Sequence, residues 1–216
     1  MSLIIGFFRL FFDLLYHQFA WTYDLVAAVV SLGRWKDWVR SSLPYMNGRI
    51  LEIGFGPGHL QKAMNEKGFS VFGLDESRQM AIQARRKLKK CDFPVRLVRG
   101  HAQSIPFGSG SFDTVVATFP SEYIFEIRTL REIRRVLAPG GRLVVVPTAW
   151  ITGKSWLDKA AAWLNRAAGQ TPEMVGGLST AVRAQFGRGG FSIRTEMIPV
   201  KGSQVLLIEA TPSTFL

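Results

Sequence analysis

Short apolar runs that alternate with amphipathic stretches are the main pattern of the chain from about residue 42 onward. The runs are β-rich and end at glycine or polar residues, as buried parallel strands do. Strands that alternate with helices predict a parallel sheet with helices on both faces, and therefore an α/β fold. Predicted strands cover residues 49–53, 70–74, 95–99, 112–118 and 142–146. A first predicted helix ends near Ser41, and three more cover residues 59–67, 77–90 and 126–137. Ser77 is the expected N-cap of the helix at 77–90.

The end of the chain departs from this pattern. Residues 191–198 and 203–210 are two strand-like runs that only a few residues separate. A parallel connection needs a dozen or more residues, so these runs predict an antiparallel hairpin. We therefore expect a Rossmann-like, doubly wound sheet that is mostly parallel with an antiparallel C-terminal hairpin strand. This ending argues against a nicotinamide dehydrogenase, whose sheet is all parallel.

The N-terminal segment is unusually apolar. Residues 1–33 contain three charged side chains, and no uncharged apolar stretch reaches the ~18 residues of a spanning helix. Neither a basic region nor a cleavage pattern of a secretory signal is present. We expect residues 1–41 to form apolar helices, and residues 42–216 to form one further domain. The apolar helices could be a lid on the domain, a contact with a second subunit, or an interfacial membrane anchor, and we slightly favour the anchor.

Composition narrows the class of protein. The 216 residues fit a single globular core, with 47% hydrophobic and 20% charged residues. The only cysteine, Cys91, has no partner in ligand-like spacing, so we expect no disulfide and no metal site. The net charge of +11 favours anionic partners. The densest basic run, residues 85–90, is typical of a solvated helix end, where cations complement the helix dipole.

A glycine loop carries the candidate chemistry. Residues 50–59 read Ile-Leu-Glu-Ile-Gly-Phe-Gly-Pro-Gly-His, a strand that runs into three glycines and then a helix. Glycines permit positive φ and a close approach to a ligand, and the free N–H groups at the helix start favour an anionic group. The spacing is G-x-G-x-G and departs from the dinucleotide fingerprint G-x-G-x-x-G, because His59 stands where that fingerprint has its third glycine.

Two acidic residues strengthen the loop as a cofactor site. Asp75 ends the second predicted strand about 20 residues after the loop, where a carboxylate can accept ribose hydroxyl protons. Its alternative role is to begin a helix, where the dipole favours an acid. Glu52 lies in the strand directly before the loop, and a buried carboxylate there needs a hydrogen-bond partner. We therefore assign Glu52 to the same site.

These residues resemble the class I S-adenosylmethionine-dependent methyltransferases over roughly residues 20–211. Residues 51–58 are similar to that family's glycine motif, 73–75 to its ribose motif, and 130–143 to its helix and turn before the fifth strand. Residues 100–107 are similar to its adenine-contacting loop, although His101 stands where an aspartate is usual. The resemblance implies S-adenosyl-L-methionine as the cofactor, with an adenine pocket at Ala102 and Gln103. The implied cofactor-binding residues are Glu52, Gly54, Phe55, Gly56, Gly58, Asp75, Glu76, Met80, His101, Ala102, Gln103, Thr118, Phe119 and Pro120.

The N-terminal part resembles a narrower group. Residues 19–24 and 33–39 are similar to stretches of the ubiquinone/menaquinone C-methyltransferases and the small phospholipid N-methyltransferases. This resemblance implies a hydrophobic or lipid-like acceptor, either a phospholipid amine headgroup or an isoprenoid quinone. The lone cysteine, the apolar N-terminus and the positive charge add the expectation of a cytoplasmic protein in peripheral contact with the inner, anionic face of the membrane.

Methyl transfer needs few catalytic side chains, because an in-line displacement depends mainly on positioning in a dry pocket. An acceptor that loses a proton would still benefit from a nearby base, for which Tyr23, Asp24 and Tyr123 are the candidates, with His17 as a further one. The tyrosines could equally be aromatic walls of the pocket. His59 could be a neighbour of the cofactor or a surface residue.

Residues 155–169 predict an amphipathic helix that either packs on the core, caps the pocket or contacts lipid. Three functions thus remain open. The first is a membrane-associated methyltransferase for a lipid-like acceptor, and the second is a soluble small-molecule methyltransferase with an apolar lid. The third is a basic nucleic-acid-binding protein with an inert fold, which we disfavour because no aromatic-basic RNA motif is present.

Overall fold

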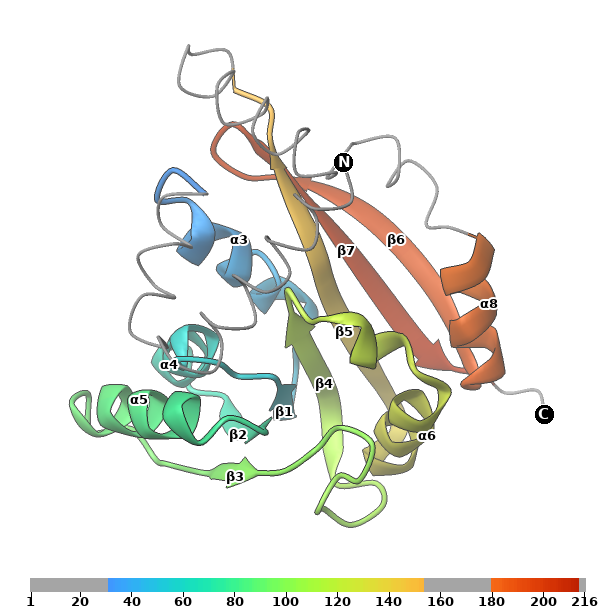
Figure 1. Ribbon diagram of the computed structural model, residues 1–216, viewed down its shortest axis with the longest axis horizontal. Helices are drawn as coiled ribbons and strands as arrows, with labels where there is room; N and C mark the ends of the chain where they lie inside the picture. Colours follow the sequence, from blue (N-terminus) through green and yellow to red (C-terminus); the bar gives the residue numbers. More distant parts are fainter. Residues whose placement is uncertain (1–30, 154–179, 214–216) are drawn as a thin grey trace, which may run out of the picture.

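The computed structural model describes residues 31–153 and 180–213 (Figure 1). The predicted helix at 155–169 and most of the apolar segment 1–41 lie outside these ranges, as do His17, Tyr23 and Asp24. Within the described ranges, no helix is both long and apolar enough to cross a membrane.

A seven-stranded sheet in the order β3-β2-β1-β4-β5-β7-β6 forms the centre of the molecule. The parallel part pairs β1 with β2 and β4, β2 with β3, and β4 with β5. β7 pairs antiparallel with both β5 and β6, so the predicted hairpin and the predicted fold class are confirmed. The strands are β1 (Arg49–Ile53), β2 (Ser70–Asp75), β3 (Leu97–Arg99), β4 (Phe112–Thr118), β5 (Leu137–Ile151), β6 (Phe191–Pro199) and β7 (Ser203–Pro212).

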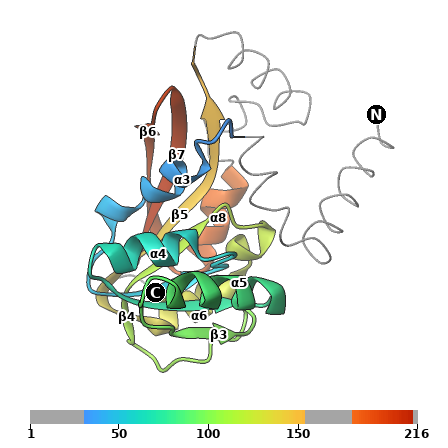
Figure 2. The ribbon, with the colours of Figure 1, turned by 90° about the vertical axis from the view of Figure 1, so that its left-hand side faces the viewer.

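Helices cover both faces of the sheet, as Figures 1 and 2 show, with α3, α4 and α5 on one side and α6 and α8 on the other. The helices are α3 (Trp35–Arg40), α4 (His59–Glu66), α5 (Arg78–Lys89), α6 (Ile127–Val136) and α8 (Thr180–Arg188). Two short 3-10 turns, η1 (Leu43–Tyr45) and η2 (Glu122–Phe125), complete the described elements. As predicted, the Ser77 hydroxyl caps α5 by accepting a hydrogen bond from the Met80 N–H.

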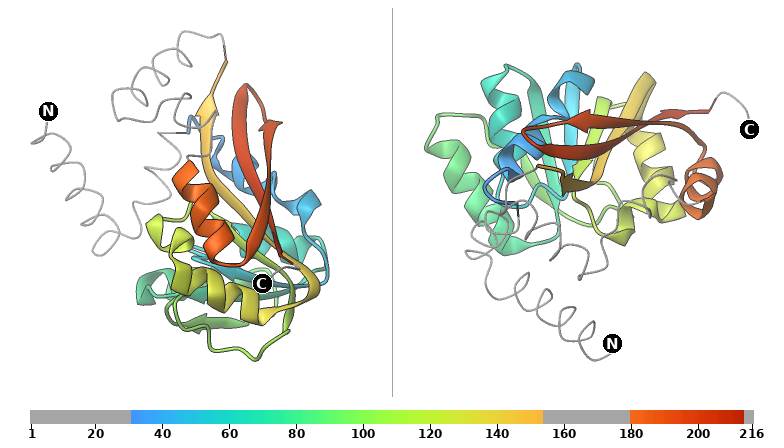
Figure 3. Two further views of the ribbon diagram at one scale, coloured as in Figure 1. Left: turned by 90° about the vertical axis from the view of Figure 1, so that its right-hand side faces the viewer. Right: turned by 90° about the horizontal axis from the view of Figure 1, so that it is seen from above.

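The core consists of one apolar layer on each face. Buried side chains of α6, η2 and α8, such as Leu130, Ile124 and Phe186, pack on one face of the sheet. Trp38 of α3 and Leu60 of α4 pack on the other. Figure 3 shows the same layers from the side and from above.

Two sequence predictions are corrected. The fifth strand runs over Leu137–Ile151 instead of 142–146, because pairing with β7 continues beyond the register shift between Val145 and Thr148. At its other end, β5 includes the predicted turn at 138–141, because Leu137 pairs with Phe112 of β4. Helix α8 was not predicted, and its only buried residue in the structure is Phe186.

Candidate active site

A pocket of about 430 Å³ lies where the parallel strands end. This is the edge at which open α/β sheets bind their ligands. Its walls come from the loop after β1, the end of β2, the loop after β3 and the segment that leads from β4 into η2. The lining residues are Ile53, Gly54, Leu74, Asp75, Glu76, Gly100, His101, Ala102, Gln103, Phe119, Pro120, Ser121 and Tyr123.

The backbone of the glycine loop strongly favours glycine at three positions. Gly54, Gly56 and Gly58 have φ values of 70°, 51° and 80°, in the left-handed region that residues with a Cβ rarely adopt. A Cβ on Gly58 would also lie 2.8 Å from the Ala84 Cβ, so the loop packs directly against α5. The loop therefore turns tightly from β1 into α4 and keeps its backbone close to the pocket.

Asp75 connects this loop to the end of β2. Its Oδ2 accepts a hydrogen bond from the Gly56 N–H and its Oδ1 accepts one from the Ser77 N–H, both at 2.8 Å. Burial raises the pKa of Asp75, while these two hydrogen bonds oppose that shift. Each carboxylate oxygen can accept one more hydrogen bond, so Asp75 can still bind hydroxyl groups in the pocket.

Glu52 lies behind the pocket wall. Its side chain is buried under the loop at 1% exposure, and its Oε2 has no hydrogen-bond partner. Burial raises its pKa well above the ordinary value, a hydrogen bond with Gln61 lowers it, and the charge of Asp75 raises it again. A raised pKa favours the neutral carboxylic acid, which can donate as well as accept a hydrogen bond.

The loop after β3 forms the polar end of the pocket. The His101 Nδ1 lies 3.1 Å from Glu76 Oε2, and the Gln103 amide donates to Glu126 at 2.9 Å. Behind this loop, Arg135 of α6 donates to the carbonyls of Ile105 and Phe107 at 2.9 and 2.8 Å. Glu132 accepts from the Ile105 N–H at 2.9 Å. The pocket wall is therefore fastened to α6.

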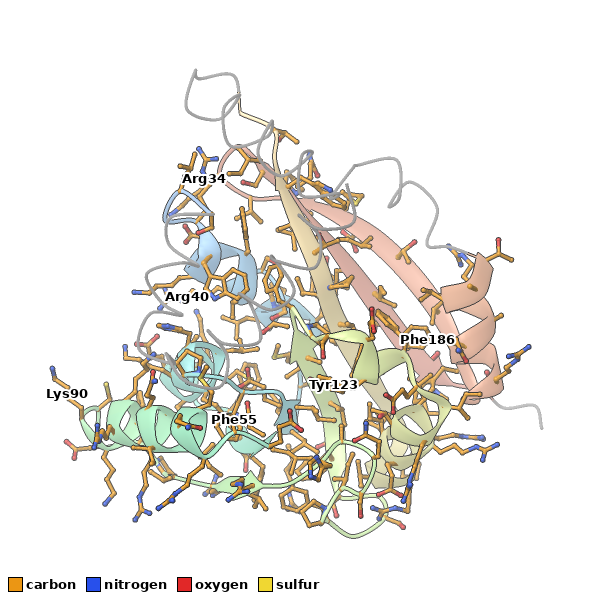
Figure 4. All side chains as sticks on the ribbon, in the orientation of Figure 1. Arg34, Arg40, Phe55, Lys90, Tyr123 and Phe186 are labelled. Atoms are coloured by element: carbon orange, nitrogen blue, oxygen red, sulfur yellow. The ribbon has the colours of Figure 1, made fainter. Side chains whose placement is uncertain are left out.

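Aromatic residues form the other end. Phe119, directly after β4, has a φ of 48°, which is a strained conformation for a residue with a bulky side chain. Its N–H donates to Val146 at 2.7 Å, and its ring stacks on Trp35 of α3 with 4.1 Å between centroids. Tyr123 lies over the glycine loop, because a Cβ on Gly54 would be 2.5 Å from its hydroxyl oxygen. Figure 4 shows Tyr123 near the centre of the molecule.

The structure brings most of the predicted site residues to one pocket, but not all of them. Met80 is fully buried in α5, and neither it nor Thr118 is part of the lining. Four lining residues were not singled out from the sequence: three lie within the motifs at 51–58, 73–75 and 100–107 and the fourth directly follows Pro120, and none carries a signal of its own. The predicted residues that line the pocket are Gly54, Asp75, Glu76, His101, Ala102, Gln103, Phe119, Pro120 and Tyr123. The predicted residues that are not part of the lining are Glu52, Phe55, Gly56, Gly58, Met80 and Thr118, and the lining residues that were not predicted are Ile53, Leu74, Gly100 and Ser121.

No cluster of three or more metal-ligating side chains occurs within residues 31–153 and 180–213. His59 lies at the start of α4, where both ring nitrogens are 3.2 Å from the Lys87 amino group, and it is not part of the pocket lining.

Comparison with known proteins agrees with this geometry. A family model described as a methyltransferase domain matches residues 51–145. Demethylmenaquinone methyltransferase of Thermus thermophilus is 34% identical over 139 residues, which cover 61% of this chain and 63% of the relative. The protein of the same name from Thermotoga maritima is 30% identical over 162 residues, or 69% of each chain. The chain spans about half to two thirds of the length of the first curated relatives that it matches.

Solved structures share the fold. A crystal structure of a SAM-dependent methyltransferase from Aquifex aeolicus superposes with a TM-score of 0.58 at 18% sequence identity. The superposition covers 84% of this chain and 95% of that one.

Proposed function

We propose that this chain, which belongs to the class I S-adenosylmethionine-dependent methyltransferases, transfers a methyl group to a hydrophobic acceptor with a quinone-like ring. Membership of the family follows from the similarity to the Thermotoga maritima relative and the matched methyltransferase domain. The family and cofactor that the sequence predicted are thereby confirmed. The acceptor and the membrane contact are proposals.

The residues of the pocket fit S-adenosylmethionine. The volume of about 430 Å³ lies within the range of cofactor pockets. Asp75 offers two remaining acceptor positions for a ribose, and the loop of Gly54 and Gly56 allows the methionine part to lie against the backbone. Glu76, His101 and Gln103 line the end that would take the adenine.

The aromatic end of the pocket is the observation that carries the acceptor proposal. Phe119 and Tyr123 line it, Pro120 lies between them, and Trp35 supports Phe119 from behind. Flat apolar walls of this kind favour a ring that can stack on them. The names of the relatives, demethylmenaquinone methyltransferases, support a quinone ring over a phospholipid amine headgroup.

When bound, S-adenosylmethionine would supply a methyl group on a positively charged sulfur, and the acceptor would bond to this methyl group as the sulfur leaves in line as a neutral thioether. The residues of this chain then have to orient the acceptor ring and exclude water. Phe119 and Pro120 would fix the plane of the ring. Tyr123, whose hydroxyl lies over Gly54, would hydrogen-bond the acceptor group that loses its proton. Tyr23 and Asp24 stay candidates for the same role, outside the described residues.

We also propose that the protein meets its acceptor at the cytoplasmic, anionic face of a membrane. An isoprenoid quinone is dissolved in lipid, and a net charge of +11 attracts the protein to anionic headgroups. The apolar segment 1–33 agrees with contact of this kind.

Methyl transfer to a short-chain demethylated naphthoquinol, compared with phosphatidylethanolamine, tests the proposal. For Phe119→Leu we expect KM for the quinol to rise about three- to tenfold, the value of one aromatic contact, with an unchanged Kd for S-adenosylmethionine. Phe125→Leu is the matched control, because Phe125 lies in η2 and is not part of the pocket lining.

Other results would select the alternatives. If methyl transfer occurs only to phosphatidylethanolamine, the acceptor is a phospholipid amine headgroup and not a quinone. Equal turnover of water-soluble acceptors without vesicles would favour a soluble enzyme with an apolar lid. Calorimetry that finds no S-adenosylmethionine binding, together with salt-dependent RNA binding, would favour an inert fold.

A further inference from the structure

Helix α5 presents an outer face that is basic and carries an exposed apolar residue. Met80, Ala84 and Leu88, each 0% exposed, recur every four residues and define the inner face. The residues opposite them form what we name the α5 outer face. Its members are Arg78, Ile82, Arg85, Arg86 and Lys89.

Ile82 lies in the middle of this face and is 41% exposed. It is one of only three large hydrophobic side chains that are exposed among the described residues. Cations in the last turn of a helix complement its dipole, which would account for Arg86 and Lys89. The dipole accounts neither for Ile82 nor for Arg78 in the first turn.

Positive charge is concentrated around the same face. Residues 76–99 contain eight Lys and Arg and two Asp and Glu, a net charge of +6 out of the chain's +11. Of the two acids, Glu76 pairs with His101. Arg96, directly before the neighbouring strand β3, and Arg99, the last residue of that strand, are also exposed. Figure 4 shows side chains with blue nitrogen tips projecting from α5 and β3, with Lys90 at the end of the helix.

No carboxylate of the described residues forms an ion pair with this face. Within residues 31–153 and 180–213, the ion pairs found involve Arg40, Lys62, His101, Arg135, Arg142 and Lys201, and none involves a residue of the α5 outer face. An unpaired set of cations produces a field that extends about 10 Å from the surface at 0.1 M salt.

The face also adjoins the pocket. Helix α5 begins directly after Asp75 and Glu76, which line the pocket, and the Arg99 Nε donates to the Glu76 carbonyl at 3.1 Å. The pocket rim therefore lies at the Arg78 end of the α5 outer face, and Arg85, Arg86 and Lys89 lie further along the helix.

We propose that the α5 outer face, with Arg96 and Arg99, is the surface by which this protein docks on an anionic lipid bilayer. Each basic residue near such a bilayer strengthens binding about fivefold, and Ile82 would insert between the headgroups. A single-stranded nucleic acid would call for exposed aromatic rings on which bases stack, and this face has none among its five members. The inference rests on the proposed membrane acceptor, to which it adds the orientation of the protein.

Co-sedimentation of the full chain with vesicles tests the docking face. The probes are phosphatidylcholine vesicles with and without phosphatidylglycerol. The apolar N-terminal segment would bind both kinds, so the ratio of the two affinities isolates the contribution of charge. The test variant is Arg85→Glu/Lys89→Glu. Its matched control is Arg128→Glu/Arg131→Glu, which makes the same charge change at exposed positions of α6.

We expect the α5 variant to lose at least about thirtyfold in affinity for anionic vesicles, the effect of two lost cations, and the α6 control about threefold or less. Ile82→Ser should weaken binding to anionic vesicles, whereas Met197→Ser, at a position on β6 that is 44% exposed, should not. Equal losses in both double variants would show attraction by net charge alone and overturn the proposal. Preferential binding of an RNA oligonucleotide, lost in the α5 variant, would also overturn it.

Calorimetric binding of S-adenosylmethionine separates this proposal from the enzymatic one. An unchanged Kd in the α5 variant shows that the pocket is intact, so that lost vesicle binding reports on the surface. If the unaltered chain fails to bind S-adenosylmethionine but keeps the α5-dependent vesicle binding, the proposed function fails and the docking face stands.

Discussion

Asp75 serves both the backbone and the pocket because each of its carboxylate oxygens can accept two hydrogen bonds. One bond to each oxygen comes from Gly56 and Ser77, which fixes the glycine loop relative to the start of α5. The remaining positions face a pocket that Asp75 lines. Loop geometry and cofactor binding therefore depend on the same side chain.

Asp75→Asn is expected to weaken binding of S-adenosylmethionine at least about a hundredfold, because charge-assisted hydrogen bonds are each worth about 1.5–3 kcal/mol. Isothermal titration calorimetry measures the change. Asp92→Asn is the control, since Asp92 is exposed and an asparagine tolerates its φ of 54°. An unchanged affinity in Asp75→Asn would mean that the carboxylate does not bind the cofactor.

Glu52→Gln is expected to change how stability depends on pH. The ordinary pKa of Glu52 is 4.5 and burial raises it well above that value, so the unfolded chain releases this proton at lower pH than the folded one. The contribution of Glu52 to folding stability should then fall by up to about 1.4 kcal/mol per pH unit as pH rises above the unfolded pKa. The glutamine variant lacks this contribution, and its stability relative to the unaltered protein should increase with pH.

Urea unfolding at several pH values from about 4 to 8 checks this expectation. The new amide could change the free energy of unfolding by the same amount at every pH. The diagnostic quantity is therefore the slope of the free energy of unfolding against pH. Parallel pH profiles for both proteins would show that Glu52 stays ionised when folded.

The residues whose chemistry is local in the sequence were the ones that could be predicted. The glycine loop and Asp75 follow from a strand, a turn and an acid at a fixed spacing. By contrast, Trp35 supports Phe119 only because α3 packs over the end of β4, a contact between distant parts of the chain. No pattern in the sequence indicates that contact, or the positive φ of Phe119.

At the scale of elements, α6 holds the pocket wall through Arg135. This residue donates to two carbonyls of the loop after β3, while Glu132 accepts from the Ile105 N–H and also binds Arg135. The guanidinium lowers the pKa of Glu132, which therefore stays ionised at neutral pH. Arg135 is thus a positioning residue for the part of the pocket that contains Ala102 and Gln103.

Arg135→Ala is expected to raise the Kd for S-adenosylmethionine about tenfold, because the loop would have to be ordered at each binding event. Arg135→Lys should be intermediate, since an ammonium cannot reproduce the planar fork. Arg134→Ala is the matched control, because Arg134 donates its hydrogen bond to the carbonyl of Ser213, the residue directly after β7. Hydrogen exchange should show faster exchange in residues 100–107 with unchanged protection in β1. Loss of protection throughout would instead indicate a general loss of stability.

Most elements were predictable because their boundaries carry strong signals, such as the cap at Ser77 and the glycines after β1. The full length of β5 was not predictable, since Pro147 interrupts the apolar run and the pairing with β7 resumes only at Thr148. Helix α8 contains Gly187 and buries one side chain, so its periodicity is weak. In both cases tertiary pairing, which the sequence does not display, decides the structure.

The whole molecule carries a net charge of +11, and more than half of it lies in residues 76–99. Such an excess attracts anionic surfaces and at the same time destabilises the folded protein by self-repulsion. Salt screens both effects, because the Debye length falls from about 30 Å at 0.01 M to about 10 Å at 0.1 M. Stability and vesicle binding should therefore respond to salt in opposite directions.

We expect the Tm to rise by about 2–4 °C between 0.01 and 0.1 M sodium chloride, a shift that corresponds to about 1 kcal/mol for a domain of this size. Over the same range, affinity for anionic vesicles should fall. Arg85→Glu/Lys89→Glu lowers the net charge from +11 to +7, because each substitution removes two charges. Its Tm should therefore rise less with salt. An equal rise in both proteins would show that salt acts by binding or exclusion at the surface, and that charge concentrated on α5 does not limit the stability of this fold.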